Sequence, residues 1–511
     1  MTETRDLAPE SVEELFRRFD ADALTKEDRP IVRAMMEGYV LLGHAVKEKN
    51  GKIHKLLRMI FGTKTEKTRN ILPKGLPKTK GEKSTPRGHG RNGALSYKGG
   101  RKVTVSHASL KKGDTCPECQ KGKVYPTTSG VTVRITGGAP LTATSFELEK
   151  LRCNLCGEVF TATTPDKESE KYDAAAGAMI ALMKYGTGVP FNRLEQLEES
   201  MGVPLPASTQ WDIVEKTAKP ARPAYKELIR QAAQGEVIHN DDTTMKILAD
   251  VNEGRKGTFT TGMLSVAGEK KIALFFTGHR HAGENLADLL AERHPDRAPP
   301  IQMADALSRN ISREFVTLLA NCLAHARRNF VDVAESFPEE CRYVIELFAK
   351  VYGHDARTKE EKMSPEERLE YHKAHSGPLM EDLSEWMTAQ FDKKCVEPNS
   401  GLGKAFSYML NHWQPLTLFL RVPGAPIDNN VCEQALKMAI RHRRNSLFYR
   451  TLHGAYIGDL FMSIIHTCRL SKVNPFEYLI ALQRHSHEVF KNPQEWLPWN
   501  YDAAVTGLSP P

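Results

Sequence analysis

Long hydrophobic runs are absent from this chain, and cysteine and aromatic residues are scarce. Even Ile272-Ala273-Leu274-Phe275-Phe276 is soon interrupted, far short of the roughly 20 apolar residues that span a bilayer. The opening Met1-Thr2-Glu3-Thr4-Arg5-Asp6 has neither the basic start nor the apolar core of a secretory signal. Nine cysteines in 511 residues are too few for a disulfide scaffold, and their odd number argues against full pairing. We therefore expect a soluble, intracellular protein with reduced thiols and no membrane partner.

Positive charge is concentrated in one part of the chain. The formal net charge is +8, but residues 47–102 alone hold 17 Lys and Arg against three Glu. Repeated Pro, Gly, Lys and Arg with almost nothing apolar cannot repay the entropy of ordering, so residues 71–102 are predicted to be a flexible basic linker. This segment favours a polyanionic partner, with Lys64, Lys67 and Arg69 as candidate DNA contacts.

The remaining patterns indicate a multidomain α+β protein. Residues 1–70 read as a helical DNA-binding or oligomerisation region, and 166–233 as helices. Within the latter, residues 190–197 and 202–211 have the layout of a helix-turn-helix, or of an ordinary helical hairpin, with Ser208 as the expected cap. Strands are predicted at 237–241, 258–266, 271–277 and 301–304, with a helix at 284–293, which indicates an α/β domain with a mixed sheet over 234–330. A helical insertion over 331–422, the rest of the α/β domain over 423–485 and a tail over 486–511 complete the chain.

Two cysteine pairs mark a small module over 103–165. Cys116-Pro117-Glu118-Cys119 and Cys153-Asn154-Leu155-Cys156 are separated by 33 residues that include the short alternating runs Val131–Ile135 and Phe146–Leu151. Two thiolates from each pair suit one tetrahedral zinc ion, whereas buried structural cysteines are the alternative. Four thiolates leave no open position, so such an ion would stabilise the fold and take no part in catalysis.

Three carboxylates stand in settings typical of a cage for paired magnesium ions. Asp241 and Asp305 each end an apolar run, and Glu433 lies inside a predicted helix. An aspartate at a strand end is often a turn or cap residue instead, and alternation of strand side chains lets only one of Asp241 and Asp242 face a shared site. Asp428, or the asparagine after it, is expected to cap the Glu433 helix.

Several basic residues accompany these carboxylates. His325 could orient a ligand or contact phosphate, or could be an ordinary core histidine; Arg327 and Arg328 follow it directly. The helix that carries Glu433 continues through Arg441, Arg443 and Arg444. If the carboxylate cage exists, these arginines are expected to position phosphates; without the cage, they would form an ordinary solvated helix face.

A family resemblance rests on these same segments. His239-Asn240-Asp241-Asp242-Thr243, residues 322–328, residues 427–436 and Val473-Asn474-Pro475-Phe476-Glu477-Tyr478-Leu479 resemble the transposases of the insertion sequence 66 family. The paired cysteine module and the basic N-terminal region are also similar to that family. Where the family usually has Asp-Glu-Thr and Asp-Gly-Tyr, this chain has Asp241-Asp242-Thr243 and Asp305-Ala306-Leu307.

The resemblance implies a ribonuclease-H-like catalytic core interrupted by the helical insertion, with Asp241, Asp305 and Glu433 as its catalytic triad. It selects Asp241 over Asp242. It further implies two Mg²⁺ (or Mn²⁺) ions in the site and one structural zinc. The implied partners are transposon ends, target DNA and accessory transposition proteins. A homodimer or higher oligomer and a cytoplasmic, nucleoid-associated location are also implied. The competing interpretations are a noncatalytic or domesticated DNA-binding regulator and a nuclease of the same fold that joins no strands.

Overall fold

The computed structural model describes residues 9–33, 35, 103–127, 135, 138–156, 158–164, 170–253 and 257–507. The chain divides into two compact units, one of residues 1–74 with 141–511 and the other of residues 75–140. Lys64, Lys67, Arg69 and the basic linker lie outside the described residues. The first unit contains all the acidic residues of the predicted catalytic site.

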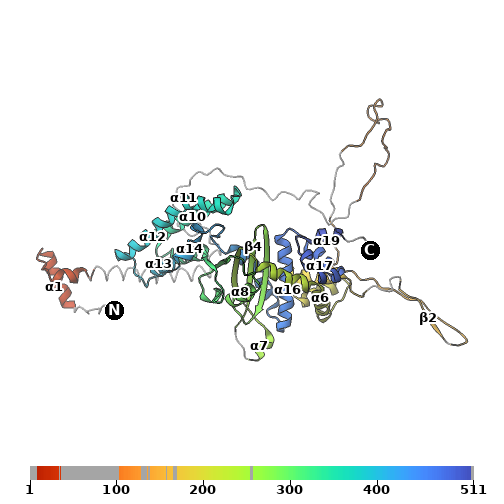
Figure 1. Cartoon of the computed structure of the whole chain (residues 1–511), viewed down its shortest axis with the longest axis horizontal. Coiled ribbons are helices and arrows are strands. Elements are labelled where there is room, and N and C mark those ends of the chain that lie inside the picture. Colours follow the sequence, from red (N-terminus) through yellow and green to blue (C-terminus); the bar gives the residue numbers. More distant parts are fainter. Residues whose placement is uncertain are drawn as a thin grey trace. The chain divides into compact units, whose positions relative to one another are not determined.

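A five-stranded mixed sheet lies at the centre of the first unit, in the order β5-β4-β3-β6-β7 (Figure 1). Its strands are β3 (Val237–Met245), β4 (Thr258–Ala267), β5 (Lys270–Gly278), β6 (Ile301–Ala304) and β7 (Leu318–Asn321). β4 runs antiparallel to both β3 and β5, whereas β6 is parallel to β3 and β7 is parallel to β6. The register pairs Val237 with Ile301 and His239 with Met303, so the same offset carries Asp241 and Asp305 to one place.

Helices cover the faces and one edge of this sheet. They are α6 (Ala207–Ala232), α8 (Ala282–Ala291), α15 (Asn430–Ser446) and α16 (Leu452–Leu470). Side chains of α6, α15 and α16 share one hydrophobic core with β3, β4 and β5. Burial of these apolar side chains, at about 25 cal/mol per Å² of apolar surface, fixes the helices on the sheet.

The edge strand β5 is covered by polar side chains of α16. The backbone N–H groups of Ala273, Phe275 and Thr277 donate to Thr467, Ser463 and Asp459, with N···O distances of 3.1, 2.9 and 2.6 Å. A strand advances about 6.7 Å in two residues and a helix about 6 Å in four, so the two rows match. The helix thereby satisfies edge groups that would otherwise pair with another strand.

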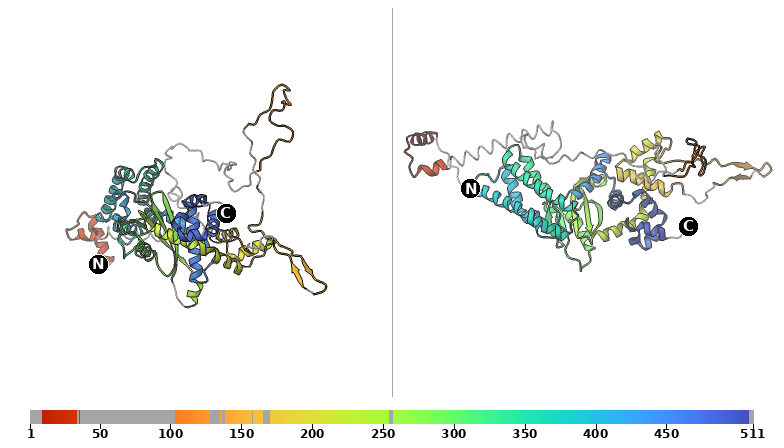
Figure 2. Two further views of the ribbon diagram at one scale, coloured as in Figure 1. Left: turned by 45° about the vertical axis from the view of Figure 1, so that its right-hand side comes forward. Right: turned by 90° about the horizontal axis from the view of Figure 1, so that it is seen from above.

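Helices fill the stretch from 331 to 420, as predicted (Figure 2), and most of them share a second hydrophobic core with β6 and β7. They are α9 (Leu323–Val333), α10 (Pro338–Glu360), α11 (Pro365–His375), α12 (Gly377–Asp392), α13 (Gly401–Asn411) and α14 (Trp413–Leu416). Among the described residues, the other elements of at least five residues are α1 (Pro9–Asp20), α4 (Ala174–Ala181), η2 (Leu182–Thr187), α5 (Phe191–Ser200), α7 (Leu248–Asn252), α17 (Pro475–Arg484), α18 (Ser486–Lys491) and α19 (Tyr501–Gly507).

Some local predictions were wrong. Strand structure within Phe146–Leu151 is limited to the start of β1 (Lys150–Arg152), which pairs antiparallel with β2 (Val159–Thr161). Most of Val131–Ile135 lies outside the described residues. Ser208 does not cap α6, because the helix already begins at Ala207 after Pro206. The pair α5 and α6 exists where a helix-turn-helix was predicted, and its reading of DNA stays a prediction.

Candidate active site

The neighbours Asp241 and Asp242 on β3 face different surroundings. The Asp242 carboxylate accepts bonds from the Thr261 hydroxyl at 2.7 Å and the Ala282 N–H at 3.1 Å, and its other contact is His281 Nδ1 at 3.0 Å. Its side chain is 2% exposed. Asp241 Oδ1, in contrast, accepts only the backbone N–H of Asp242, at 2.8 Å, and a long contact from Asn310. Asp242 therefore ties β3 to α8, whereas the Asp241 carboxylate has fewer hydrogen-bond partners.

Asn310 links the first two predicted catalytic residues. This buried residue ends the short 3₁₀ helix η3 (Ser308–Asn310), and its Nδ2 donates to Asp305 Oδ1 at 2.6 Å and to Asp241 Oδ1 at 3.5 Å. Its own carbonyl accepts from the side-chain amides of Asn240, at 2.6 Å, and Gln302, at 2.7 Å. Two strands thus hold the loop after Asp305 against Asp241.

The sequence did not predict a structural role for the amide side chains of Asn240, Gln302 and Asn310. Asn240 lies one residue before Asp241, Gln302 lies three before Asp305 in the otherwise apolar β6, and both are 0% exposed. A polar side chain at an inward-facing strand position must find a buried partner, so that interruption was the available signal.

Glu433 lies in the first turn of α15, and the residue that anchors this turn is Asn429. Asn429 Oδ1 lies 3.0 Å from His239 Nδ1, and its Nδ2 donates to the Asn240 carbonyl at 3.1 Å. Asn429 occupies the N-cap position without a capping bond from its side chain. Asp428 Oδ1 instead accepts the N–H of Asn430 at 3.1 Å. The helix start is therefore fixed to β3 itself, beside Asp241.

The three carboxylates are close enough to influence each other. Burial raises the pKa of Asp241 to about 7, and the charges of Asp305, Glu433 and Asp242 act in the same direction, against the hydrogen bond from Asp242 N–H. Glu433 Oε1 is buried without a hydrogen-bond partner among the described residues. A cluster of like charges with an unsatisfied oxygen is stabilised by a cation, and three carboxylates are the oxygen donors that Mg²⁺ and Mn²⁺ prefer.

His325 is part of the same cluster. Its Nε2 lies 3.6 Å from Glu433 Oε1, and ligand atoms of Cys322, His325 and Glu433 all lie within 4.8 Å of one another. Cys322 precedes α9, and burial raises the pKa of its thiol to about 11. His325 therefore lies beside the Glu433 carboxylate.

The predicted phosphate-positioning residues are divided between two helices. Arg327 and Arg328 lie two and three residues after His325 on α9; Arg327 is half-buried and Arg328 is exposed. On α15, Arg441 and Arg444 are exposed. Arg443 Nη1 donates to the hydroxyls of Thr243 and Thr244, at 2.9 and 2.7 Å, and so fastens the last turn of α15 to the end of β3.

Both cysteine pairs form compact turns within their own units. The Gly122 N–H donates to Cys119 Sγ at 3.4 Å, and Cys116 N–H donates to the Gly122 carbonyl at 2.8 Å. Hydrogen bonds from backbone N–H groups, led by that of Lys121, lower the pKa of the Cys119 thiol. Cys153 and Cys156 occupy the turn between β1 and β2. Backbone donors around a sulfur stabilise a thiolate, which is the form that binds zinc.

Comparison with known proteins identifies the family of this chain. Residues 171–457 match the model of the family described as Transposase IS66 family. The chain belongs to the IS66 transposase family. The matched residues include Asp241, Asp305 and Glu433, and the resemblance noted in the sequence is thereby confirmed.

Curated relatives in Sinorhizobium fredii (strain NBRC 101917 / NGR234) are also similar. Uncharacterized protein y4jD is 26% identical over 354 residues, which are 65% of this chain and 67% of the relative. Uncharacterized protein y4hP is 25% identical over 389 residues, 70% of this chain and 67% of the relative. In the described part of this IS66-family chain, no helix is both long and apolar enough to cross a membrane.

Proposed function

We propose that this protein is a DNA transposase that cleaves the ends of its insertion sequence and joins them to target DNA. The observation that supports the proposal is that Asn310 bridges Asp241 and Asp305, while the charges of Asp305 and Glu433 add to burial in raising the pKa of Asp241. The strand order β5-β4-β3-β6-β7, with the helical stretch 331–422 preceding α15, supports a ribonuclease-H-like core with an insertion.

Asp241, Asp305 and Glu433 would hold two Mg²⁺ (or Mn²⁺) ions. Such a pair lowers the pKa of an attacking water or DNA 3′-hydroxyl and stabilises the leaving 3′-oxygen of an in-line displacement. Asn310 fixes the Asp241 and Asp305 carboxylates relative to each other, and His325 orients that of Glu433. One site can then serve both reactions, since a water nicks the transposon end and the freed 3′-hydroxyl attacks the target.

DNA would be positioned by basic residues around this site. Arg327, Arg328, Arg441, Arg443 and Arg444 are the proposed phosphate contacts near the carboxylates, and Lys64, Lys67 and Arg69 add affinity that is independent of sequence. Two transposon ends must be brought together before joining, so a homodimer or higher oligomer is proposed, with accessory transposition proteins in the bacterial cytoplasm.

The proposal is tested with a plasmid that carries the inverted repeats flanking the gene. Wild type with Mg²⁺ or Mn²⁺ is expected to nick the repeat ends and to produce joined strands. Asp241→Asn is expected to lower both rates at least about 1,000-fold, because one shared ligand is lost. Asp502→Asn, an exposed aspartate on α19, is the control and should retain full activity.

Metal binding gives a second readout that does not depend on catalysis. Mg²⁺ should raise the Tm of wild type and of Asp502→Asn, but not that of Asp241→Asn. Nicking without joined strands would leave a nuclease, and DNA binding without any metal-dependent nicking would leave a noncatalytic regulator.

A further inference from the structure

Three large apolar side chains are exposed where α15 meets α16. Leu447 is 65% exposed, Phe448 40% and Leu452 44%, within six consecutive positions. A single exposed leucine is ordinary, but adjacent large apolar side chains beside a proposed active-site helix indicate a contact surface.

Backbone hydrogen bonds fix the turn that carries Leu447 and Phe448. Leu447 has a φ of 67°, a left-handed conformation that a leucine rarely adopts without a compensating constraint. Its N–H donates to the Arg443 carbonyl at 2.8 Å. Two residues later, the N–H of the buried Tyr449 donates to the Lys246 carbonyl, also at 2.8 Å. The turn is therefore pinned on both sides, and residues 447 and 448 project from a rigid support.

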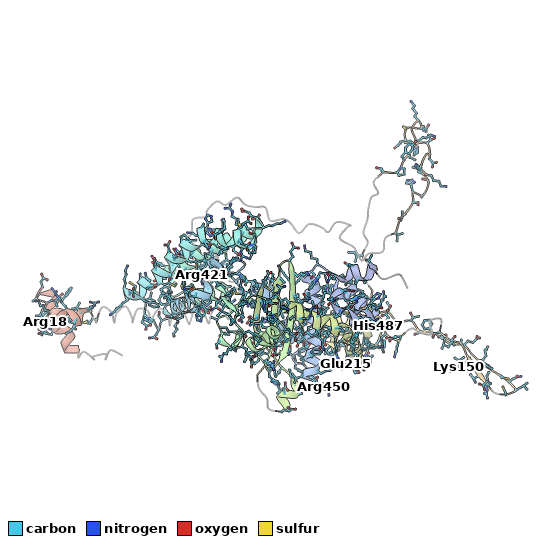
Figure 3. The ribbon with its side chains drawn as sticks, in the orientation of Figure 1. Arg18, Lys150, Glu215, Arg421, Arg450 and His487 are labelled. Atoms are coloured by element: carbon cyan, nitrogen blue, oxygen red, sulfur yellow. The ribbon has the colours of Figure 1, made fainter. Side chains whose placement is uncertain are left out.

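Exposed cations form a stripe that leads from the candidate active site to this turn. Lys437, Arg441 and Arg444 are exposed on α15 at spacings of four and three residues, which places them on one helix face. Arg450 adds a further exposed cation beyond the turn (Figure 3). A basic stripe beside three carboxylates fits the phosphate backbone of a duplex whose scissile bond lies at the carboxylates.

We propose that Leu447 and Phe448 form an apolar wedge that enters between base pairs of the bound transposon end. The wedge rests on the proposed transposase function. Apolar side chains flanked by phosphate-binding cations unstack base steps in other DNA-bending proteins. Leu447 lies 14 positions after Glu433, which is about 21 Å along the helix, or about six base pairs of duplex. With the duplex running along α15, the distorted step lies about six base pairs from the cleaved phosphate, and the distortion opens the duplex end for strand transfer.

The test measures base unstacking directly. The probe is a short duplex of the flanking inverted repeat with 2-aminopurine at one position at a time, bound in Ca²⁺ so that catalysis does not interfere. Wild type and Asp241→Asn should both raise the fluorescence severalfold at a step about six base pairs from the cleaved phosphate. Leu447→Ala/Phe448→Ala should lose that rise yet bind the duplex within a few fold of wild type.

The matched control is Phe490→Ala on α18, which removes a phenylalanine that is 75% exposed and distant from the stripe in sequence. It should leave the fluorescence rise unchanged. Two results would overturn the wedge. One is a fluorescence rise in the double variant as large as that of wild type, and the other is a rise of similar size at every labelled position. The wedge is also overturned if, without DNA, wild type sediments as a dimer and the double variant as a monomer. Leu447 and Phe448 would then contact a second copy of the chain. If wild type also fails to nick the repeats, the proposed function fails; normal nicking without distortion removes the wedge alone.

Discussion

At the scale of single residues, the choice between two adjacent aspartates shows what a sequence can and cannot determine. Strand alternation predicts that only one of Asp241 and Asp242 faces the site, and the family resemblance selects Asp241. The geometry supplies the reason, since Thr261, His281 and Ala282 surround the Asp242 carboxylate. Those partners come from β4 and the start of α8, so they follow from the fold and no local pattern announces them.

Asp459 on α16 carries a residue-scale prediction about pH. Burial raises the pKa of its carboxyl to about 7, although its hydrogen bonds with Thr277 oppose that rise. The unfolded-state pKa is about 4, so the folded protein binds more protons between pH 4 and 7. This group therefore contributes stability at low pH that is lost as pH rises through 7, by up to a few kcal/mol.

Asp459→Asn is expected to remove that part of the pH dependence, because the amide oxygen still accepts the Thr277 N–H and carries no charge. Denaturant unfolding of both proteins between pH 5 and 8 measures it. Asp459→Leu is the contrasting variant and should be less stable at every pH, since the edge N–H loses its acceptor. Parallel pH profiles for wild type and Asp459→Asn would contradict the assignment.

At the scale of elements, alternating or uniformly apolar runs predicted β3, β4, β5 and β6. Asp241 lies within β3 and Asp305 directly follows β6, and the parallel pairing of these two strands places both residues at the same offset from the paired positions. β7 was missed because its four residues, Leu318–Asn321, include no β-branched or aromatic residue and do not alternate between apolar and polar. The Asn310 bridge was also missed. It depends on a loop conformation that only packing against β3 and β6 defines.

The approach of α15 to the sheet gives an element-scale prediction. Gly262 on β4 pairs with Asp241, and a Cβ built on it would lie 2.7 Å from both Cγ and Cδ2 of Leu436. Gly262→Ala should therefore push α15 from the sheet and cost about 1–3 kcal/mol of stability. Because Glu433 moves with the helix, strand cleavage should fall on the order of 100-fold.

The double variant Gly262→Ala/Leu436→Ala separates this steric effect from a general loss of stability. Leu436→Ala alone leaves a cavity and should cost about 2–5 kcal/mol. Combined with Gly262→Ala, it makes room for the new methyl group, so the double variant should lose less stability than the two single variants added together. Its cleavage rate should exceed that of Gly262→Ala. Strict additivity in both measurements would show that the helix approach is not limiting.

At the scale of the whole molecule, the zinc prediction concerns both cysteine pairs. Metal analysis of the untagged protein should find about one zinc per chain. Cys119→Ser and Cys153→Ser should each abolish it, because one tetrahedral ion needs ligands from both cysteine pairs. Cys395→Ser removes an exposed cysteine of the helical insertion and should leave the zinc in place. Retention of zinc by either knuckle variant would mean that the pairs do not share an ion.

The basic segment gives the last whole-molecule prediction, which concerns how affinity depends on salt. Each phosphate contact contributes about 0.9 to the slope of log K against log salt concentration, because neutralised phosphates release counterions. Replacing Lys64, Lys67 and Arg69 together by alanine should therefore reduce the magnitude of that slope by about 2 to 3. The change should be the same for duplexes with and without the inverted repeats, since these contacts read the backbone and not the bases.

The matched control replaces three exposed lysines of the helical insertion, Lys373, Lys393 and Lys394, which removes the same charge from another surface. If both triple variants change the slope equally, net charge alone drives the binding and residues 47–102 are not the DNA contact.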